Sequence, residues 1–153
     1  MSDMHLYTLD LFWRGDHTRS YEEYTREHLI RIKGKNELRA TADPLFRGDG
    51  SLHNPEDLLL AALSSCHLLT YLALCARARI NVLSYHDQAE GTLMLTKDGG
   101  GHFSGVMLRP QVRIEDGGHL EKAIAFHEAA HKYCFIARSV NFPVNCEAAV
   151  SAA

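Results

Sequence analysis

The hydrophobic pattern of the chain is dominated by one stretch in its middle, residues 54–79. From Leu58 to Ala76 nearly every position is apolar, interrupted only by isolated serine, histidine and threonine residues. Asn54 can cap a helix, Pro55 suits the first helical position, and acidic residues follow directly. We therefore predict a long helix over this stretch that is buried on every face, because a helix that is apolar all round needs cover all round.

Shorter stretches of alternating apolar and polar residues on both sides of this helix indicate β-strands. Six of them are predicted as strands: 5–14, 24–32, 37–42, AEGTLMLT (89–96) within the segment 82–96, 103–115 and 144–150. The first three form an antiparallel meander, and the next two form a hairpin around the glycine-rich loop 97–102. Residues 119–134 have helical spacing. The order βββ, long helix, ββ, helix, β predicts an α+β fold with six-stranded antiparallel sheet content.

Length, charge and cysteine usage narrow the class of protein. A chain of 153 residues is expected to form a single domain, 1–153, with a substantial core. A net charge of -3 gives no general attraction to nucleic acid or to an anionic membrane. The start of the chain lacks the pattern of a secretory signal, and the four cysteines have no CxxC spacing, so we expect a reducing cytoplasm. The run Leu58–Leu63 is too short to span a membrane.

The predicted elements leave the long helix short of cover. Six strands and one further helix must enclose an apolar helix of about 36 Å. A second copy of the chain would supply the missing wall, and two-fold dimers are the commonest assembly. We therefore expect an intimate symmetric homodimer, with a monomer whose sheet curls around the helix as the alternative.

Two motifs carry a resemblance to a known family. The segment NPEDLLLAALSSC, residues 54–66, ends in a cysteine, and the later segment AHKYCFIARSV, residues 130–140, places a second cysteine near the end of a helix. With this spacing and order of elements the chain resembles the OsmC/Ohr family of organic hydroperoxide reductases over nearly its whole length, as a divergent member. The resemblance implies an OsmC-like fold and an intertwined homodimer whose two thiols reduce peroxides.

The resemblance also implies roles for these two cysteines. Cys66 matches the peroxidatic thiol, which attacks an organic hydroperoxide and becomes a sulfenic acid. Cys134 matches the resolving thiol, which forms a disulfide with Cys66 that an external dithiol of the dihydrolipoamide type reduces. No bound cofactor and no metal are expected. The two remaining thiols, Cys75 and Cys146, are predicted to be inert and buried, as free cysteines usually are.

The family site also contains an acidic residue and an arginine. Glu56 matches the acidic residue. The arginine is expected from the loop of the first hairpin, where Arg19 fits best and Arg14 and Arg39 are the alternatives; it would favour the thiolate. Glu56 and Cys66 are ten residues apart, or about 15 Å along one helix. The site therefore needs either a break in the helix or a glutamate from a partner subunit, and in a continuous helix the thiol needs an arginine for activation.

Two positions depart from the family pattern, and one motif suggests another chemistry. His67 and Phe135 follow the two cysteines where the family often has an aromatic residue and a proline. Residues 127–131 read HExxH, with His127 and His131 one helical turn apart, as in zinc hydrolases, where the glutamate Glu128 acts as the base. Cys134 or Glu147 would then be the third ligand. A zinc-dependent hydrolase is therefore one alternative, and a non-enzymatic redox sensor or binder of a small apolar ligand is the other.

Overall fold

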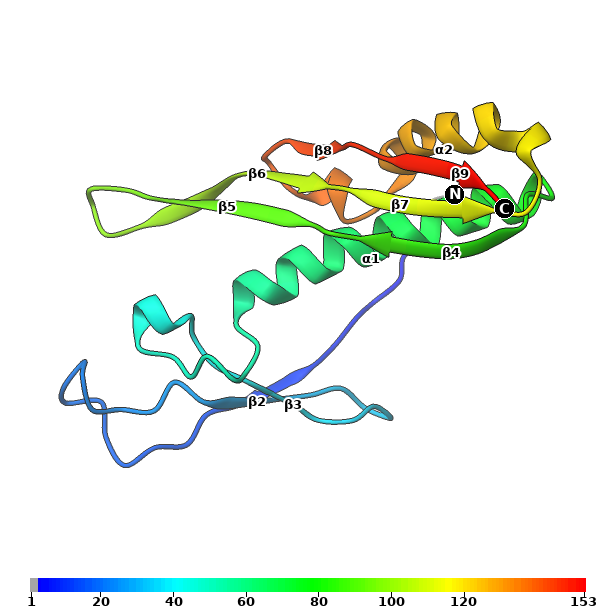
Figure 1. Ribbon diagram of the computed structural model, residues 1–153. Helices are drawn as coiled ribbons and strands as arrows, with labels where there is room; N and C mark the ends of the chain where they lie inside the picture. The colour runs from blue at the N-terminus through cyan, green and yellow to red at the C-terminus, as the bar shows by residue number, and fades with distance from the viewer. Residues whose placement is uncertain (1–2) are drawn as a thin grey trace. The chain divides into compact units, whose positions relative to one another are not determined.

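The computed structural model describes residues 3–153 (Figure 1). The chain forms two compact units, one ending at Leu59 and the other running from Leu60 to Ala153. The chain contains both helices and strands, which confirms the α+β class. The single domain over 1–153 stays a prediction.

The amino-terminal unit contains a small antiparallel sheet. Its strands are β1 (Asp10–Phe12), β2 (His28–Arg31) and β3 (Leu38–Ala40), in the order β1-β2-β3. The predicted meander is confirmed, although each strand has only three or four residues. A short 3₁₀ helix, η1 (Pro44–Phe46), follows in the loop before the long helix.

The long helix α1 (Pro55–Arg77) begins and ends as its sequence predicts. The Asn54 side chain accepts a hydrogen bond from the Asp57 amide at 2.8 Å, and the Asp57 carboxylate accepts one from the Asn54 amide at 3.2 Å. These reciprocal bonds satisfy amide groups that a helix start leaves free. Arg79, just beyond the helix, adopts the left-handed conformation with φ 58°, which ends the helical path.

The prediction that α1 is buried on every face is wrong for the single chain. Its buried residues form one stripe at four-residue spacing, Leu63, His67, Tyr71 and Cys75, while Leu69 is 63% exposed. A sheet and one further helix cover only one side of it. By length and composition α1 could also cross a membrane, and only 22% of its most apolar stretch is buried. The apolar side of α1 therefore lacks cover within the described residues.

The carboxy-terminal unit contains two three-stranded sheets, in the orders β4-β7-β9 and β5-β6-β8 (Figure 1). The strands are β4 (Val82–Asp87), β5 (Glu90–Leu95), β6 (Gly101–Leu108), β7 (Pro110–Ile114), β8 (Val144–Cys146) and β9 (Ala149–Ala152). The predicted strands 103–115 and 144–150 are thus each split into two, and β4 precedes the strand predicted at 89–96, which gives nine strands among residues 3–153 in place of six. β8 and β9 pair in parallel with β6 and β7, so the antiparallel prediction is wrong for them.

The split of the predicted strand 103–115 has a local cause. Pro110 has no amide hydrogen to continue a ladder, and the preceding Arg109 amide donates to the Asp87 carboxylate at 2.7 Å. Asp87 is the last residue of β4, so this bond fixes the point at which the chain passes from one sheet to the other.

The helix α2 (Leu120–Tyr133) completes the core of this unit. Buried residues of α1, β7 and α2 form one hydrophobic cluster, in which Tyr71 and Ile114 have no exposed surface. The Tyr71 hydroxyl donates to the Ala123 carbonyl at 3.0 Å and thereby joins the two helices. This core holds the middle of α1 against the end of α2, where the two cysteines of interest lie.

Candidate active site

The structure brings Cys66 and Cys134 together from distant parts of the sequence. Cys66 lies in the middle of α1, and Cys134 is the residue at which α2 ends. Their thiols are hydrogen-bond partners, and both are free. The chain after Cys134 turns tightly into η3 (Ala137–Ser139), so that the Ala137 amide donates to the Cys134 sulfur at 3.4 Å.

The surroundings of the two sulfurs give the two thiols different pKa values. Burial raises the pKa of Cys66, but hydrogen bonds from the Ile136 amide, the Cys134 thiol and the Phe135 amide outweigh it and hold the pKa below its ordinary value. Burial and the hydrogen bond to Cys66 raise the pKa of Cys134 to about 11. Cys66 is therefore the thiol that ionises first, with Cys134 as a protonated donor beside it.

This arrangement adds a means of activation that the sequence did not predict. The helix is continuous from Pro55 to Arg77, a case for which we expected an arginine to be required for activation of Cys66. Two backbone amides of the turn after α2 lower the pKa of Cys66 within the single chain, and the need for an arginine stays a prediction. Sequence patterns missed them, because a backbone amide is present at every residue except proline and only the local fold directs it at a sulfur.

An apolar groove of about 680 Å³ lies beside Cys66. Leu69, Ala73 and Leu74 of α1 line one side, and Ile136 lines the other. Such a lining favours a hydrocarbon group over a small polar molecule. The groove therefore offers a reactive sulfur next to room for an apolar ligand.

A second cavity, of about 670 Å³, lies in the amino-terminal unit and contains Glu56. The Glu56 Oε2 atom is buried and has no hydrogen-bond partner among residues 3–153. The same cavity is lined by Arg26, whose guanidinium lies 3.7 Å from the centre of the Tyr24 ring and 4.7 Å from that of the Tyr21 ring. The Arg26 guanidinium also donates hydrogen bonds to the backbone carbonyls of these two tyrosines. A carboxylate and an arginine held by aromatic rings thus share one cavity.

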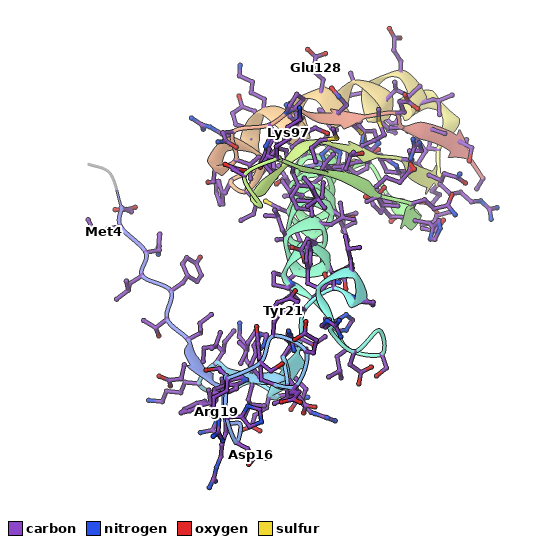
Figure 2. All side chains as sticks on the ribbon, turned by 90° about the vertical axis from the view of Figure 1, so that its left-hand side faces the viewer. Met4, Asp16, Arg19, Tyr21, Lys97 and Glu128 are labelled. Carbon is purple, nitrogen blue, oxygen red and sulfur yellow. The ribbon has the colours of Figure 1, made fainter. Side chains whose placement is uncertain are left out.

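The arginines favoured by the sequence lie elsewhere in the same unit. Arg19 is on an exposed loop (Figure 2) and is not among the residues, within 3–153, that line the cavity of Glu56. Arg14 and Arg39 line a different cavity, and Arg39 pairs with Glu27 at 2.7 Å. The role of Arg19 stays a prediction. Sequence reasoning missed Arg26, although its spacing from two tyrosines was a signal for cation–π contact.

The HExxH motif does not form one site. His127 is 5% exposed and its ring stacks on Tyr71, with centroids 4.0 Å apart. Glu128 and His131 are exposed, and Glu128 projects outward from α2 (Figure 2). Cys134, the suggested third ligand, is paired with Cys66. The interpretation as a hydrolase centre is therefore wrong, because residues one turn apart on α2 differ in whether they face the core.

His127 instead meets His67 in the core. The His67 Nε2 atom lies 3.1 Å from His127 Nδ1, and the Cys146 sulfur lies 3.8 Å from the same His67 atom. Burial lowers the pKa of both histidines, that of His127 to about 4, and raises the pKa of Cys146 to about 11. Cys75, in contrast, is buried in the hydrophobic core, where burial raises its pKa.

Comparisons with known proteins agree with this fold. Residues 48–149 match the family model described as OsmC-like protein. An OsmC-like protein of unknown function from Vibrio cholerae is 31% identical, with a TM-score of 0.86, and the match covers 95% of this chain and 100% of that one. The uncharacterized protein YmaD of Bacillus subtilis is 25% identical, over 98% of this chain and 97% of its own. The organic hydroperoxide resistance protein OhrB of the same species has the same fold, with a TM-score of 0.63 at 20% identity, over 96% of this chain and 100% of OhrB.

Proposed function

Since the chain belongs to the family of OsmC-like proteins, we propose that it is a thiol-dependent peroxidase that reduces organic hydroperoxides to alcohols. One observation carries the proposal, the pairing of a Cys66 thiol of lowered pKa with a Cys134 thiol whose pKa is raised to about 11. The family includes organic hydroperoxide resistance proteins, and the groove beside Cys66 is apolar. A peroxide with a hydrocarbon group fits both the thiol and the groove.

The proposed reaction has three steps. The Cys66 thiolate attacks the distal peroxide oxygen, the O–O bond breaks, and the alcohol leaves after its oxygen takes a proton, so that Cys66 becomes a sulfenic acid. The Cys134 sulfur then attacks the Cys66 sulfur, which forms a disulfide and releases water. An external dithiol supplies two electrons and two protons to restore both thiols. One hydroperoxide and one dithiol thus give one alcohol, one water and one disulfide, with no bound cofactor in the reaction.

Glu56 and an arginine are proposed to complete the site from the second subunit of a homodimer. Within one continuous helix, ten residues place Glu56 about 15 Å along the axis from Cys66. A second copy would also cover the apolar side of α1, which includes Leu69. Arg26 is the favoured arginine because it shares a cavity with the unpartnered Glu56 oxygen, and Arg19 is the alternative.

Peroxide consumption by single variants tests the thiol chemistry. Cumene hydroperoxide and dihydrolipoamide serve as substrate and reductant, and turnover is compared for the wild type, Cys66→Ser, Cys134→Ser and Cys75→Ala as the matched control. Cys66→Ser is expected to abolish turnover. Cys134→Ser is expected to accumulate a sulfenic acid on Cys66, detected by trapping and mass spectrometry. Equal turnover in wild type and Cys66→Ser would refute the proposal.

Mixing two inactive variants tests the shared site. Glu56→Gln and Cys66→Ser are each expected to be inactive alone, but a mixed dimer contains one site with an intact Cys66 and an intact Glu56 from different chains. Activity should therefore return after subunit exchange. If it does not return although mixed dimers form, Glu56 does not act across the interface. Parallel assays of Arg26→Lys and Arg19→Lys show which arginine the reaction requires.

The same assays would reveal whether the protein is instead a redox sensor or a ligand binder that does not turn over peroxide. A redox sensor would oxidise once at Cys66 and would not be reduced by the dithiol at a useful rate. A binder of apolar ligands would show a ligand-dependent rise in melting temperature without peroxide consumption. Either result would replace the peroxidase proposal.

A further inference from the structure

A second cluster of reactive side chains lies in the core of the carboxy-terminal unit, apart from the Cys66–Cys134 pair. It consists of His67 on α1, His127 on α2 and Cys146 at the end of β8. One ring nitrogen from each histidine and the cysteine sulfur all lie within 4.8 Å of one another. Three separate elements thus direct metal-binding atoms at one point, although no two of these residues are near each other in sequence.

The protein itself leaves this cluster incompletely hydrogen-bonded. The contact between His67 and His127 uses one nitrogen of each ring, at 3.1 Å. The other ring nitrogen of His127, Nε2, is buried and has no partner among residues 3–153. The hydroxyl of Tyr85, whose ring centroid lies 6.5 Å from that of His127, is likewise buried without a partner in the described part of the chain. Buried polar atoms are normally paired, so these two groups mark a part of the core that the protein's own hydrogen bonds do not satisfy.

The charge around the cluster suits a cation. Asp87 is close enough to act electrostatically on both His67 and Cys146. Its carboxylate is fixed by hydrogen bonds from the Ser64 hydroxyl and the Arg109 amide. A divalent ion with one thiolate ligand carries a net charge of +1, which this fixed carboxylate would balance.

We propose that His67, His127 and Cys146 form a binding site for one Zn²⁺ ion. Tetrahedral zinc with Zn–N of about 2.0 Å and Zn–S of about 2.3 Å places its ligands roughly 3.3 Å (N to N) and 3.6 Å (N to S) apart. In the structure His67 Nε2 lies 3.1 Å from His127 Nδ1 and 3.8 Å from the Cys146 sulfur, and all three ligand atoms lie within 4.8 Å of one another, so the cluster is close to this spacing before an ion binds. Binding forms the Zn–S bond and releases the Cys146 thiol proton to solvent, with no change in oxidation state.

The site is distinct from both chemistries discussed above. It uses His127 of the HExxH motif but neither Glu128 nor His131, so the motif contributes one ligand in place of a hydrolytic centre. It leaves Cys66 free to react. The sequence did not reveal this site, because its three ligands become neighbours only when α1, α2 and β8 pack together.

Metal titration of the full-length, reduced and chelator-treated protein tests this site. Co²⁺ replaces Zn²⁺ as a visible probe, because a cysteine ligand gives a thiolate-to-cobalt charge-transfer band in the near ultraviolet. The wild type is expected to bind one Co²⁺ per chain with this band and to lose the band when Zn²⁺ is added. Cys146→Ser should remove the band and weaken Zn²⁺ binding at least about tenfold, the effect of losing about 1.4 kcal/mol of binding free energy.

Cys66→Ser is the matched control, since it removes a thiol that is not a ligand in this proposal. It should retain the band, the one-to-one stoichiometry and the rise in melting temperature that Zn²⁺ causes. Circular dichroism in chelator checks that both variants fold, and His127→Gln gives a second, thiol-independent loss of affinity. The proposal is overturned if Cys146→Ser keeps the band, if Cys66→Ser loses it, or if the wild type binds no stoichiometric metal. These readouts do not involve peroxide turnover, so this proposal and the proposed function fail separately.

Discussion

Acid should destabilise the fold through the imidazole of His127. In the folded chain burial, together with the nearby His67, lowers the pKa of His127 from 6.5 to about 4. Between these two pH values the unfolded chain binds a proton that the folded chain does not, so the free energy of unfolding decreases as the pH decreases. At about 1.4 kcal/mol per pH unit the total loss is roughly 3 kcal/mol. This stability is fully present above the unfolded pKa and is lost below the folded one.

Urea unfolding of chelator-treated, reduced protein at about pH 7 and about pH 4 measures this loss. The variant His127→Gln lacks the titrating group and should lose roughly 3 kcal/mol less than the wild type over the same interval. His102→Gln is the control, because His102 is exposed and its replacement should leave the pH dependence unchanged. Carboxylates also titrate in this pH interval, but they are the same in both proteins, so their contribution cancels when the variant is compared with the wild type. The reasoning is refuted if His127→Gln and the wild type lose the same free energy.

Two further predictions concern the core and the thiols. Tyr71→Phe should lower the free energy of unfolding by about 1–2 kcal/mol, because it removes the buried hydrogen bond of 3.0 Å between the helices. The matched control is Tyr133→Phe, which changes an exposed tyrosine. An unchanged free energy of unfolding in Tyr71→Phe would show that the bond contributes nothing. Iodoacetamide at neutral pH should modify Cys66 well before Cys134, because the pKa of Cys66 is lowered and that of Cys134 is raised to about 11. Peptide mass spectrometry measures the order of labelling, and faster labelling of Cys134 would contradict it.

Local features of the fold were predictable from the sequence, and long-range ones were less so. Asn54 and Asp57 specify the start of α1 through bonds within one turn, so the sequence placed that boundary correctly. The split of the strands around Arg109 was missed, because it depends on a hydrogen bond to Asp87, which lies 22 positions earlier. Apolar runs mark strands but carry no information about which partner each will pair with, and β8 and β9 turned out parallel to theirs.

The candidate site shows the same division. The motifs around Cys66 and Cys134 singled out both thiols, because cysteines in matching patterns are rare enough to be informative. The cavity shared by Glu56 and Arg26 could not be inferred in the same way, because many arginines lie in the loops of the first sixty residues and only packing against tyrosine rings separates one of them. The cluster around His67 was hidden for a related reason, since its members come from three elements.

The turn after α2 stabilises charge on Cys66 with peptide groups, which carry dipoles but no net charge. Mobile ions screen distant charges strongly, but they weaken a hydrogen bond between an amide and a sulfur much less, because the two groups are in direct contact. The lowering of the Cys66 pKa by these amides should therefore change little between dilute buffer and concentrated salt. The reactivity of this thiol should therefore persist across large changes in salt concentration, whereas a proline at position 135 or 136 would remove one of these amides.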